Sequence, residues 1–535
     1  MDQPYRQHFV SGSPARTDSL DGMNTSSVVH RAGPREWAGL AILALPTALL
    51  GLDVTILYLA LPALSVDLRP SSTEALWIMD AYGFLVAGFL ITMGTLGDRV
   101  GRRRVLMIGA AAFGVVSVVA AFAPNPEILI ASRAALGVAG ATLMPSTLSL
   151  ISTMFTDARQ RAVAVGIWAM MFALGMAAGP LVGGVLLDRF WWGSAFLIAV
   201  PLVAILLALA RVLLPEYRAP DSGRIDLVSV ALSLAAILPV IYVVKRVAKD
   251  GLDVGGGVIL VAGIVFGWVF VRRQRRIADP LLDMTLFASR TFTAALGVLL
   301  FGLIGVGGVM FLVTQYVQLV AQVSPIAAGL WMGPPALMMF VAALAAPLVA
   351  RRIRPGLIVA GTLAVSTVGY LLILRAGSTG GITLVVTGFA LVYLGLGAIA
   401  ALGTDLVVGA APAAKSGSAA GMSETVQEMG LALGVAVLGS LTTAVYRHHI
   451  DQNLPDGVGS RGADAVRDSL AGAVSAEPDL APGVLDTAKD AFTAGMHTSA
   501  LVAGIGVLAL TLVSVVVLRH VGTIDSDGYS SGEKP

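Results

Sequence analysis

The chain contains no cysteine, so disulfide bonds, thiolate catalysis and cysteine metal sites are excluded, although this absence does not identify the compartment. Charged residues are also scarce, at 13% of the sequence, and aromatic residues make up 7%. Hydrophobic residues make up 56%, and the mean hydropathy is +0.84. Ordinary soluble domains carry about 25% charged residues, so this composition excludes a soluble globular protein. It indicates a protein that crosses a membrane many times.

Motifs for nucleotide, metal or nucleophilic chemistry are missing as well. The sequence has no P-loop, no Ser/His/Asp arrangement and no cluster of His, Asp and Glu at metal-ligand spacing. Its 6 histidines lie in predicted tails, in loops or near predicted helix ends. We therefore expect a protein that is not an enzyme and that uses no cofactor, no metal and no nucleic-acid partner.

Apolar runs of membrane-spanning length, about 20 residues, occur fourteen times along the sequence. An even number of spans places both termini on the same side. Arginines gather in alternate loops, and the positive-inside rule assigns these loops and both termini to the cytoplasm. Lys245, Arg246 and Lys249 are exceptions in an opposite loop and weaken the prediction of the span boundaries there. The predicted spans are residues 38–61, 76–97, 105–124, 128–151, 162–187, 193–213, 227–245, 254–271, 292–320, 326–350, 357–375, 382–404, 417–445 and 496–518.

The predicted fold is an all-α integral membrane protein with six spans, an extra pair packed at the side, and six more spans. The loop at 348–355 keeps the arginines of the loop at 94–104 but lacks its acidic residue and glycines, which indicates a faint internal duplication. We expect residues 446–495 to form a small extracellular hairpin, a helical cap or a disordered loop. The predicted divisions are a disordered cytoplasmic tail at 1–36, an N-terminal six-helix half at 37–213, a linker with two extra helices at 214–290, a C-terminal six-helix half at 291–518 and a cytoplasmic tail at 519–535.

The loop between the second and third spans, GTLGDRVGRRR at residues 94–104, is short, glycine-rich and multiply charged. Glycines let helix backbones approach closely, and arginines hold a loop on the cytoplasmic side. Asp98 would anchor a movable contact, either by pairing with a cation or by facing a helix N-terminus. The arginines alone are equally typical of a topology signal. The whole pattern resembles the signature loop of the major facilitator superfamily, and the matching positions are Gly94, Leu96, Gly97, Asp98, Arg99, Gly101, Arg102 and Arg103.

The fifth span carries small residues at four-residue spacing, which line one face of a helix. A proline within it removes a backbone donor and lets the helix kink and pack tightly. Packing without a functional direction is the alternative interpretation. The segment resembles the antiporter signature of drug-exporting members of the superfamily, through Gly175, Gly179, Pro180, Gly183 and Gly184. The fourth span adds Arg133, which is similar to the family's intramembrane arginine motif and needs a partner carboxylate or carbonyl.

Acidic residues inside predicted spans point to the chemistry, because an unpaired charge in a bilayer is costly. Asp53 lies in the first span. Trp77 and Asp80 are three residues apart in the second span, so a ring and a carboxylate share one helical face. Glu424 and Glu428 are four residues apart in the thirteenth span and also share a face. Each of these acids also has a structural interpretation. It could be a polar residue whose hydrogen bonds are satisfied inside the protein, or a residue at the membrane boundary whose side chain reaches water.

Apart from its tails, the chain resembles the fourteen-helix drug:proton antiporter family, and within it the multidrug cation exporters of the QacA, LfrA and SmvA type. The resemblance rests on Asp53, on Trp77 with Asp80 and Tyr82, and on residues 423–430. The tenth span has no acidic residue, whereas some quaternary-ammonium exporters carry one there. This departure weakens the expectation of dicationic substrates.

The resemblance implies a monomeric, proton-driven efflux antiporter in the inner cell membrane that exchanges protons for small lipophilic cations such as dyes, antiseptics and antibiotics. A proton-coupled uptake symporter and a dedicated exporter of one self-made antibiotic are the alternatives. Burial disfavours the charged form of a carboxylate, so a buried acid can take up and release protons, and no ATP site is needed. The residues implied in proton coupling are Asp53, Glu424, Glu428 and Arg133, and those implied in substrate binding are Asp80, Trp77, Tyr82, Glu424, Phe172 and Tyr316.

Overall fold

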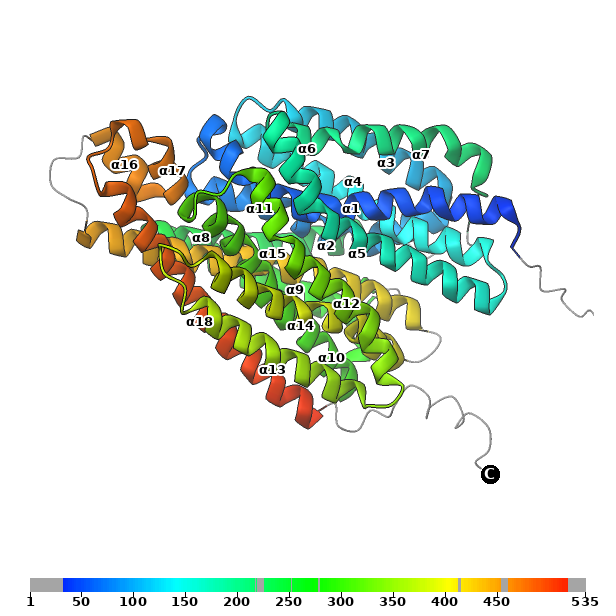
Figure 1. Ribbon diagram of the computed structural model, residues 1–535. Coiled ribbons are helices and arrows are strands. Elements are labelled where there is room, and N and C mark those ends of the chain that lie inside the picture. Colours follow the sequence, from blue (N-terminus) through cyan, green and yellow to red (C-terminus); the bar gives the residue numbers. More distant parts are fainter. Residues whose placement is uncertain are drawn as a thin grey trace, which may run out of the picture.

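The computed structural model describes residues 32–517, except 217, 219–225, 252, 278, 279, 412–414 and 454–459. The predicted C-terminal tail at 519–535 and residues 1–31 of the predicted N-terminal tail lie outside the described residues. All fourteen predicted membrane spans are present as helices long and apolar enough to cross a membrane, and the predicted all-α membrane fold is confirmed. The N-terminal end of the first of these helices and the C-terminal end of the last lie on the same side of the bundle (Figure 1).

Seven helices form the first six spans, and side chains that satisfy free backbone N–H groups set several of their starts. Ser71 and Glu74 form a capping box at one N-terminus, with Glu74 accepting from the Ser71 N–H at 2.8 Å. Asn125 and Asp157 cap two others. The helices are α1 (Pro34–Leu68), α2 (Ser72–Val100), α3 (Arg102–Ala121), α4 (Pro126–Met154), α5 (Ala158–Arg189), α6 (Ser194–Leu197) and α7 (Ala199–Leu213), and α6 and α7 together make one span.

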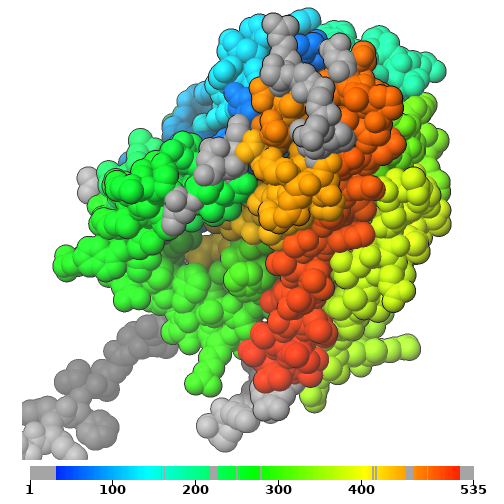
Figure 2. All heavy atoms as spheres, turned by 90° about the vertical axis from the view of Figure 1, so that its left-hand side faces the viewer, coloured from blue at the N-terminus to red at the C-terminus, as the bar shows by residue number. Residues whose placement is uncertain are grey.

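The extra pair of spans consists of α8 (Leu227–Asp250) and α9 (Val254–Gln274), which pack against each other. Asp226 and Asp253 cap their N-termini by accepting hydrogen bonds from backbone N–H groups. In addition, α8 packs against α2 and against α15 (Ser416–Asn453), so it touches one helix of each six-span set. Figure 2 shows this green segment on one side of the molecule.

The remaining spans follow the short helix η1 (Leu286–Ala288). A π-helical turn, η2 (Tyr316–Val320), ends the first of them. The other helices are α10 (Arg290–Gln315), α11 (Pro325–Trp331), α12 (Gly333–Ala350), α13 (Pro355–Ile373), α14 (Ile382–Gly409), α15 and α18 (Val484–Val517), with α16 (Ser460–Asp468), α17 (Leu470–Ser475) and η4 (Glu477–Asp479) between the last two.

The connection between the last two spanning helices is shorter than the predicted extracellular stretch 446–495, because α15 continues to Asn453 and α18 begins at Val484. Both helices extend beyond the ends of their apolar runs and remain packed there. The Tyr446 hydroxyl donates to the Val466 carbonyl at 2.6 Å, and Ala488 is fully buried. Of the three expected alternatives, the described part of this stretch forms the helical cap.

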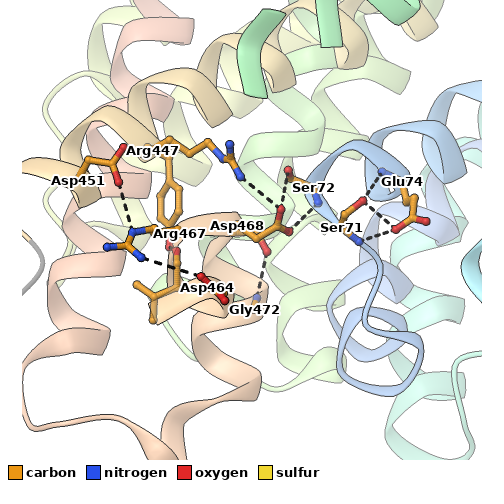
Figure 3. Close-up of polar contacts among 12 residues, drawn as sticks. Ser71, Ser72, Glu74, Arg447, Asp451, Asp464, Arg467, Asp468 and Gly472 are labelled. Atoms are coloured by element: carbon orange, nitrogen blue, oxygen red, sulfur yellow. Dashed lines mark hydrogen bonds and ion pairs between the residues drawn. The ribbon is translucent and has the colours of Figure 1, made fainter. Parts of the chain in front are cut away.

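The cap is fastened to the start of α2 (Figure 3). Asp468, at the end of α16, accepts from the Ser72 backbone N–H at 2.8 Å, and the Ser72 hydroxyl lies 3.3 Å from the same carboxylate. A carboxylate at a helix N-terminus is stabilised by the free N–H groups and the helix dipole. Arg447 of α15 lies 3.7 Å from Asp468, so this acid links α2 to α15 through the cap.

The two six-span sets meet mainly at the end that carries the cap. In Figure 1 their helices converge near α16 and α17 and spread apart toward the opposite end. Gln318 donates to the Leu59 carbonyl at 3.1 Å across this contact. Gly184 of α5 also lies close to Pro325 of α11. The fold thus holds two helical sets whose closest approach is near the predicted extracellular end.

Candidate transport site

A buried ion pair joins α1 to α4. Asp53 Oδ2 lies 2.8 Å from Arg133 Nη1, and the two side chains are 8% and 3% exposed. Arg133 Nε also donates to the Ile78 carbonyl at 3.2 Å, and its guanidinium stands 4.6 Å from the centre of the Tyr82 ring. The sequence predicted that Arg133 needs a carboxylate or a carbonyl partner, and it has both.

A small cavity of about 30 Å³ adjoins this ion pair. Tyr58, Tyr82 and Arg133 line it from the first set of helices, and Glu428 lines it from α15. Such a volume holds about one water molecule, whereas drug-sized ligands occupy several hundred Å³. The cavity is therefore bordered by polar groups from both sets of helices and is too small for a drug.

The two predicted glutamates of α15 differ in their surroundings. Glu428 is 8% exposed and faces the cavity that Arg133 also lines. Glu424 is half-buried and is not part of the cavity wall. Neither carboxylate has a hydrogen-bond partner among the described residues. Of the two, Glu428 is the one that lines the cavity.

The predicted cation site at Trp77 and Asp80 already holds a cation from the chain itself. Lys245 Nζ lies 2.6 Å from Asp80 Oδ2 and 3.9 Å from the centre of the Trp77 ring. Both charged side chains are 0% exposed. The prediction that Lys245 lies in a loop is wrong, because α8 continues beyond it to Asp250. The sequence did offer a signal for this pairing, because a buried Asp80 needs a counter-ion and Lys245 is a candidate for it.

Two other residues that were predicted to bind substrate lie away from the cavity lined by Arg133 and Glu428. Tyr316 is 1% exposed, and its hydroxyl donates to the Gly377 carbonyl at 2.5 Å, within the second set of helices. Phe172 is half-buried, and its backbone carbonyl faces Gly51 of α1. The structure brings Tyr82 to the Asp53–Arg133 pair but does not bring Tyr316 or Phe172 there.

The signature loop ties α2, α3 and α4 together. Asp98 pairs with Arg102 at 2.6 Å, the first of the two alternatives expected for this acid. Arg102 Nη1 also donates to the Pro145 carbonyl of α4 at 3.3 Å. Gly101 has φ +123°, a conformation that favours glycine, and a side chain there would collide with Glu216. Arg99 is exposed and forms no ion pair with any described residue.

Glu216, just after α7, is a second anchor of the same loop. It accepts from the Arg103 backbone N–H at 3.2 Å. Arg103 Nη1 donates to the Leu214 carbonyl at 2.9 Å. Gly97 packs against the Arg102 side chain, and Gly94 faces Pro145. All these contacts lie within the first set of helices, so the loop holds that set together as a unit.

The spacing predicted that the small face of the fifth span packs closely against a neighbouring helix, and in the structure that helix is α1. A side chain at Gly175 would collide with the Ala48 backbone, and one at Gly179 would collide with Thr55. The Cβ of a residue at position 183 would lie 2.8 Å from Ile56 Cγ1. Two members of the motif turn instead toward α11, because the Pro180 carbonyl faces Gly329 and Gly184 faces Pro325.

Residues 43–435 match the sequence profile of the Major Facilitator Superfamily. The chain belongs to the major facilitator superfamily. Multidrug efflux pump LfrA of Mycolicibacterium smegmatis is 43% identical over 494 residues, which is 92% of this chain and 98% of that protein. Methyl viologen resistance protein SmvA of Salmonella typhimurium is 32% identical over 86% of this chain and 93% of that protein. The tetracenomycin C resistance and export protein of Streptomyces glaucescens is 31% identical over 94% of each.

Solved structures of the superfamily show the same fold. A bacterial homolog of the human lysosomal transporter Spinster, in an inward-facing and occupied conformation, has a TM-score of 0.62 at 14% identity. The match covers 94% of this chain and 100% of that one. A peptide transporter POT in complex with sulfate has a TM-score of 0.60 at 19% identity, over 90% of this chain and 95% of that one. These identities support the fold alone.

Membership in the superfamily confirms the predicted class of protein. The chain is a multi-pass membrane transporter and not an enzyme, and its full-length relatives are multidrug efflux and antibiotic resistance proteins. In secondary transporters built from repeats, the substrate site commonly lies near the bilayer midplane at the interface between the repeats. In this chain Arg133 of the first helical set and Glu428 of the second line one cavity between the two sets.

Proposed function

We propose that the protein is a proton-driven multidrug efflux antiporter of the inner cell membrane. It exports lipophilic, mainly cationic compounds in exchange for protons, works as a monomer and has both termini in the cytoplasm. The names of its full-length relatives support drug efflux. The arginine-rich loops support the orientation.

The observation that carries the proposal is the cavity between the two helical sets. It brings Arg133, with its partner Asp53, to the same small space as Glu428 of the opposite set. A carboxylate in a poorly hydrated cavity must be neutralised by a proton or a cation. Asp53 and Glu428 are therefore the proposed proton carriers, and Arg133 is the internal cation that replaces the proton on Asp53.

Exchange follows from competition for this negative charge. A lipophilic cation that enters the opened cavity neutralises the same carboxylates and displaces their protons. Rocking of one helical set against the other then exposes the occupied site to the opposite side. The aromatic rings of Tyr58 and Tyr82 add faces that attract a cation without requiring hydrogen bonds.

A dedicated exporter of one antibiotic is the second candidate. The similarity to the tetracenomycin C export protein over 94% of both chains favours it. A substrate panel separates the two candidates, because a dedicated exporter responds to one compound class. Methyl viologen belongs in that panel, since it is a dication and the tenth span carries no acid.

The test is substrate-induced proton movement in vesicles that contain the purified protein and a trapped pH-sensitive dye. Ethidium or tetraphenylphosphonium added outside an antiporter enters while protons leave, so the lumen becomes alkaline. A symporter would make the lumen acidic, and that result would refute the proposal. Asp53→Asn should fold but give no pH response, because the amide keeps the shape and cannot titrate.

Two control variants complete this test. Asp67→Asn changes another acid of α1, which is exposed and accepts from Trp192 Nε1 at 2.7 Å, and it should behave as the parent. Asp53→Asn with Arg133→Gln removes both charges of the pair, so it shows whether an unpaired Arg133 is responsible for any loss of folding. A parental pH response in Asp53→Asn would exclude Asp53 as the coupling residue.

A further inference from the structure

Lys245 points into the bundle although it lies near a helix end. It is five residues from the last residue of α8, Asp250, and a lysine at such a depth normally extends its side chain to the membrane surface. Here the ammonium is 0% exposed and turns toward α2. A specific attraction therefore holds it there.

The attraction comes from two groups of α2. The ammonium lies 2.6 Å from the Asp80 carboxylate and 3.9 Å from the centre of the Trp77 ring. No other described residue forms a hydrogen bond with Asp80 or with Lys245. The lysine thus occupies a site made of one carboxylate and one aromatic face, the combination that attracts a lipophilic or quaternary cation.

A buried apolar cluster, here called the seam, adjoins the Trp77 side of this pair. Phe84 of α2, Ile241 of α8 and Ala432 and Ala436 of α15 form a buried cluster, and Trp77 packs against it. Water is excluded, so the charges on Asp80 and Lys245 must neutralise each other. The seam is made by three helices, one from each helical set and one from the extra pair.

The seam also adjoins the cavity of the candidate transport site. Met79 and Gly83, which flank Asp80 along α2, line that cavity, and so does Ala432. Asp80 therefore lies next to the cavity wall along α2, with Lys245 of α8 against its carboxylate. Because α8 packs against both α2 and α15, a rearrangement of the helical sets would act on the contact between Lys245 and Asp80.

We propose that Lys245 is a tethered competitor that occupies the Trp77–Asp80 cation site and that a cationic substrate must displace. This inference rests on the proposed export of cations. Lys245 keeps Asp80 neutralised when no substrate is present, and it sets how strongly a cation must bind in order to enter. The extra pair of helices thereby acts as a selectivity element through one side chain.

Equilibrium binding of tetraphenylphosphonium to the purified protein in lipid nanodiscs tests this role. Lys245→Met removes the competing charge and keeps most of the length of the side chain, so the Kd should fall by at least about tenfold. Lys245→Arg keeps a cation and should bind as the parent does. Triphenylphosphine oxide, a neutral compound of similar shape, should bind equally to all variants. An unchanged or higher Kd in folded Lys245→Met would overturn the proposal.

A second background removes the risk that an unpaired Asp80 prevents folding. In Asp80→Asn the carboxylate is absent, and Lys245 then only repels a cation. Asp80→Asn with Lys245→Met should therefore bind tetraphenylphosphonium more tightly than Asp80→Asn alone. Equal binding in these two variants would contradict displacement. Tighter binding of the neutral probe as well would mean that the methionine variants merely enlarge the cavity.

The outcomes also separate this inference from the proposed function. If the parent moves protons in response to tetraphenylphosphonium but Lys245→Met leaves the Kd unchanged, only the role of Lys245 fails. If no variant binds the cation and the parent moves only neutral compounds, both the inference and the export of cations fail.

Discussion

Gly184 of α5 lies against Pro325 of α11, and this contact joins the two helical sets near the predicted extracellular end. A Cβ at position 184 would lie 2.8 Å from the Pro325 carbonyl oxygen and 3.0 Å from the Cα of Ile326. Backbone cannot move aside as a flexible side chain can. A side chain added at position 184 should therefore push α5 and α11 apart.

Gly184→Leu should separate α5 from α11 and favour a state that is open at this end. The absence of native cysteine allows a single reporter, Ser65→Cys, whose position is 7% exposed and lines a second cavity beneath the helical cap. Labelling of this cysteine by a membrane-impermeant maleimide should become severalfold faster in Gly184→Leu. Gly166→Leu is the matched control, because a Cβ at Gly166 of α5 meets nothing within 4 Å. Equal labelling in both variants would contradict the wedge.

Gly179→Leu should act within the first set of helices and leave the contact between the sets intact. The new side chain would collide with Thr55, whose hydroxyl donates to the Met176 carbonyl at 3.0 Å. Overpacking of this kind costs about 1–3 kcal/mol. We expect a lower thermal unfolding midpoint and loss of export, measured against Gly166→Leu. A parental midpoint with normal export would show that this face tolerates bulk.

Asp98→Asn should slow turnover by at least about fivefold with little change in substrate affinity. The amide weakens the ion pair that holds Arg102 against the Pro145 carbonyl, while the loop stays remote from the cavity. Arg99→Ala is the control, since Arg99 of the same loop is exposed and its side chain contacts no described anion. Turnover and equilibrium binding, measured side by side, decide the point. Equal loss of binding would indicate a folding defect.

Glu428→Gln should reduce substrate-induced proton movement about tenfold more than Glu424→Gln does. The carboxylate of Glu428 lines the cavity with Arg133, whereas Glu424 does not. Helical spacing places both residues on one face of the helix, but it does not show which of the two lines the cavity. The pH response of the trapped dye measures the effect. Two variants that both respond like the parent would leave these glutamates with a purely structural role.

An ion pair outside the membrane gives a stability prediction. Asp283 lies 2.6 Å from Lys415, and hydrogen bonds from Lys415 and Thr285 lower the pKa of Asp283 below its ordinary value near 3.8. The pair therefore stabilises the folded chain above about pH 4, and this contribution is lost as the pH falls further. Because the pair is partly exposed, it contributes below about 1 kcal/mol. Asp283→Asn should lower the unfolding midpoint slightly at pH 7 and not at pH 3, where the parent should match it.

The sequence by itself determined the class of the protein and the order of its spans. Apolar runs of about 20 residues must form helices in a bilayer, because every backbone polar group has to be satisfied internally. This constraint acts locally, so all fourteen spans were found with their order correct. The small face of the fifth span and the partner that Arg133 needs were predicted for the same reason, since spacing and burial cost are properties of one helix.

Only the tertiary structure decided which buried groups meet. Helical periodicity shows which residues share a face, but it does not show the neighbour that the face contacts or how deep each helix end lies. Lys245 therefore looked like a loop residue until α8 was placed against α2, beside Asp80. The same limit applies to Glu424 and Glu428, because the rotation of α15 relative to the other helices depends on packing between segments far apart in the chain.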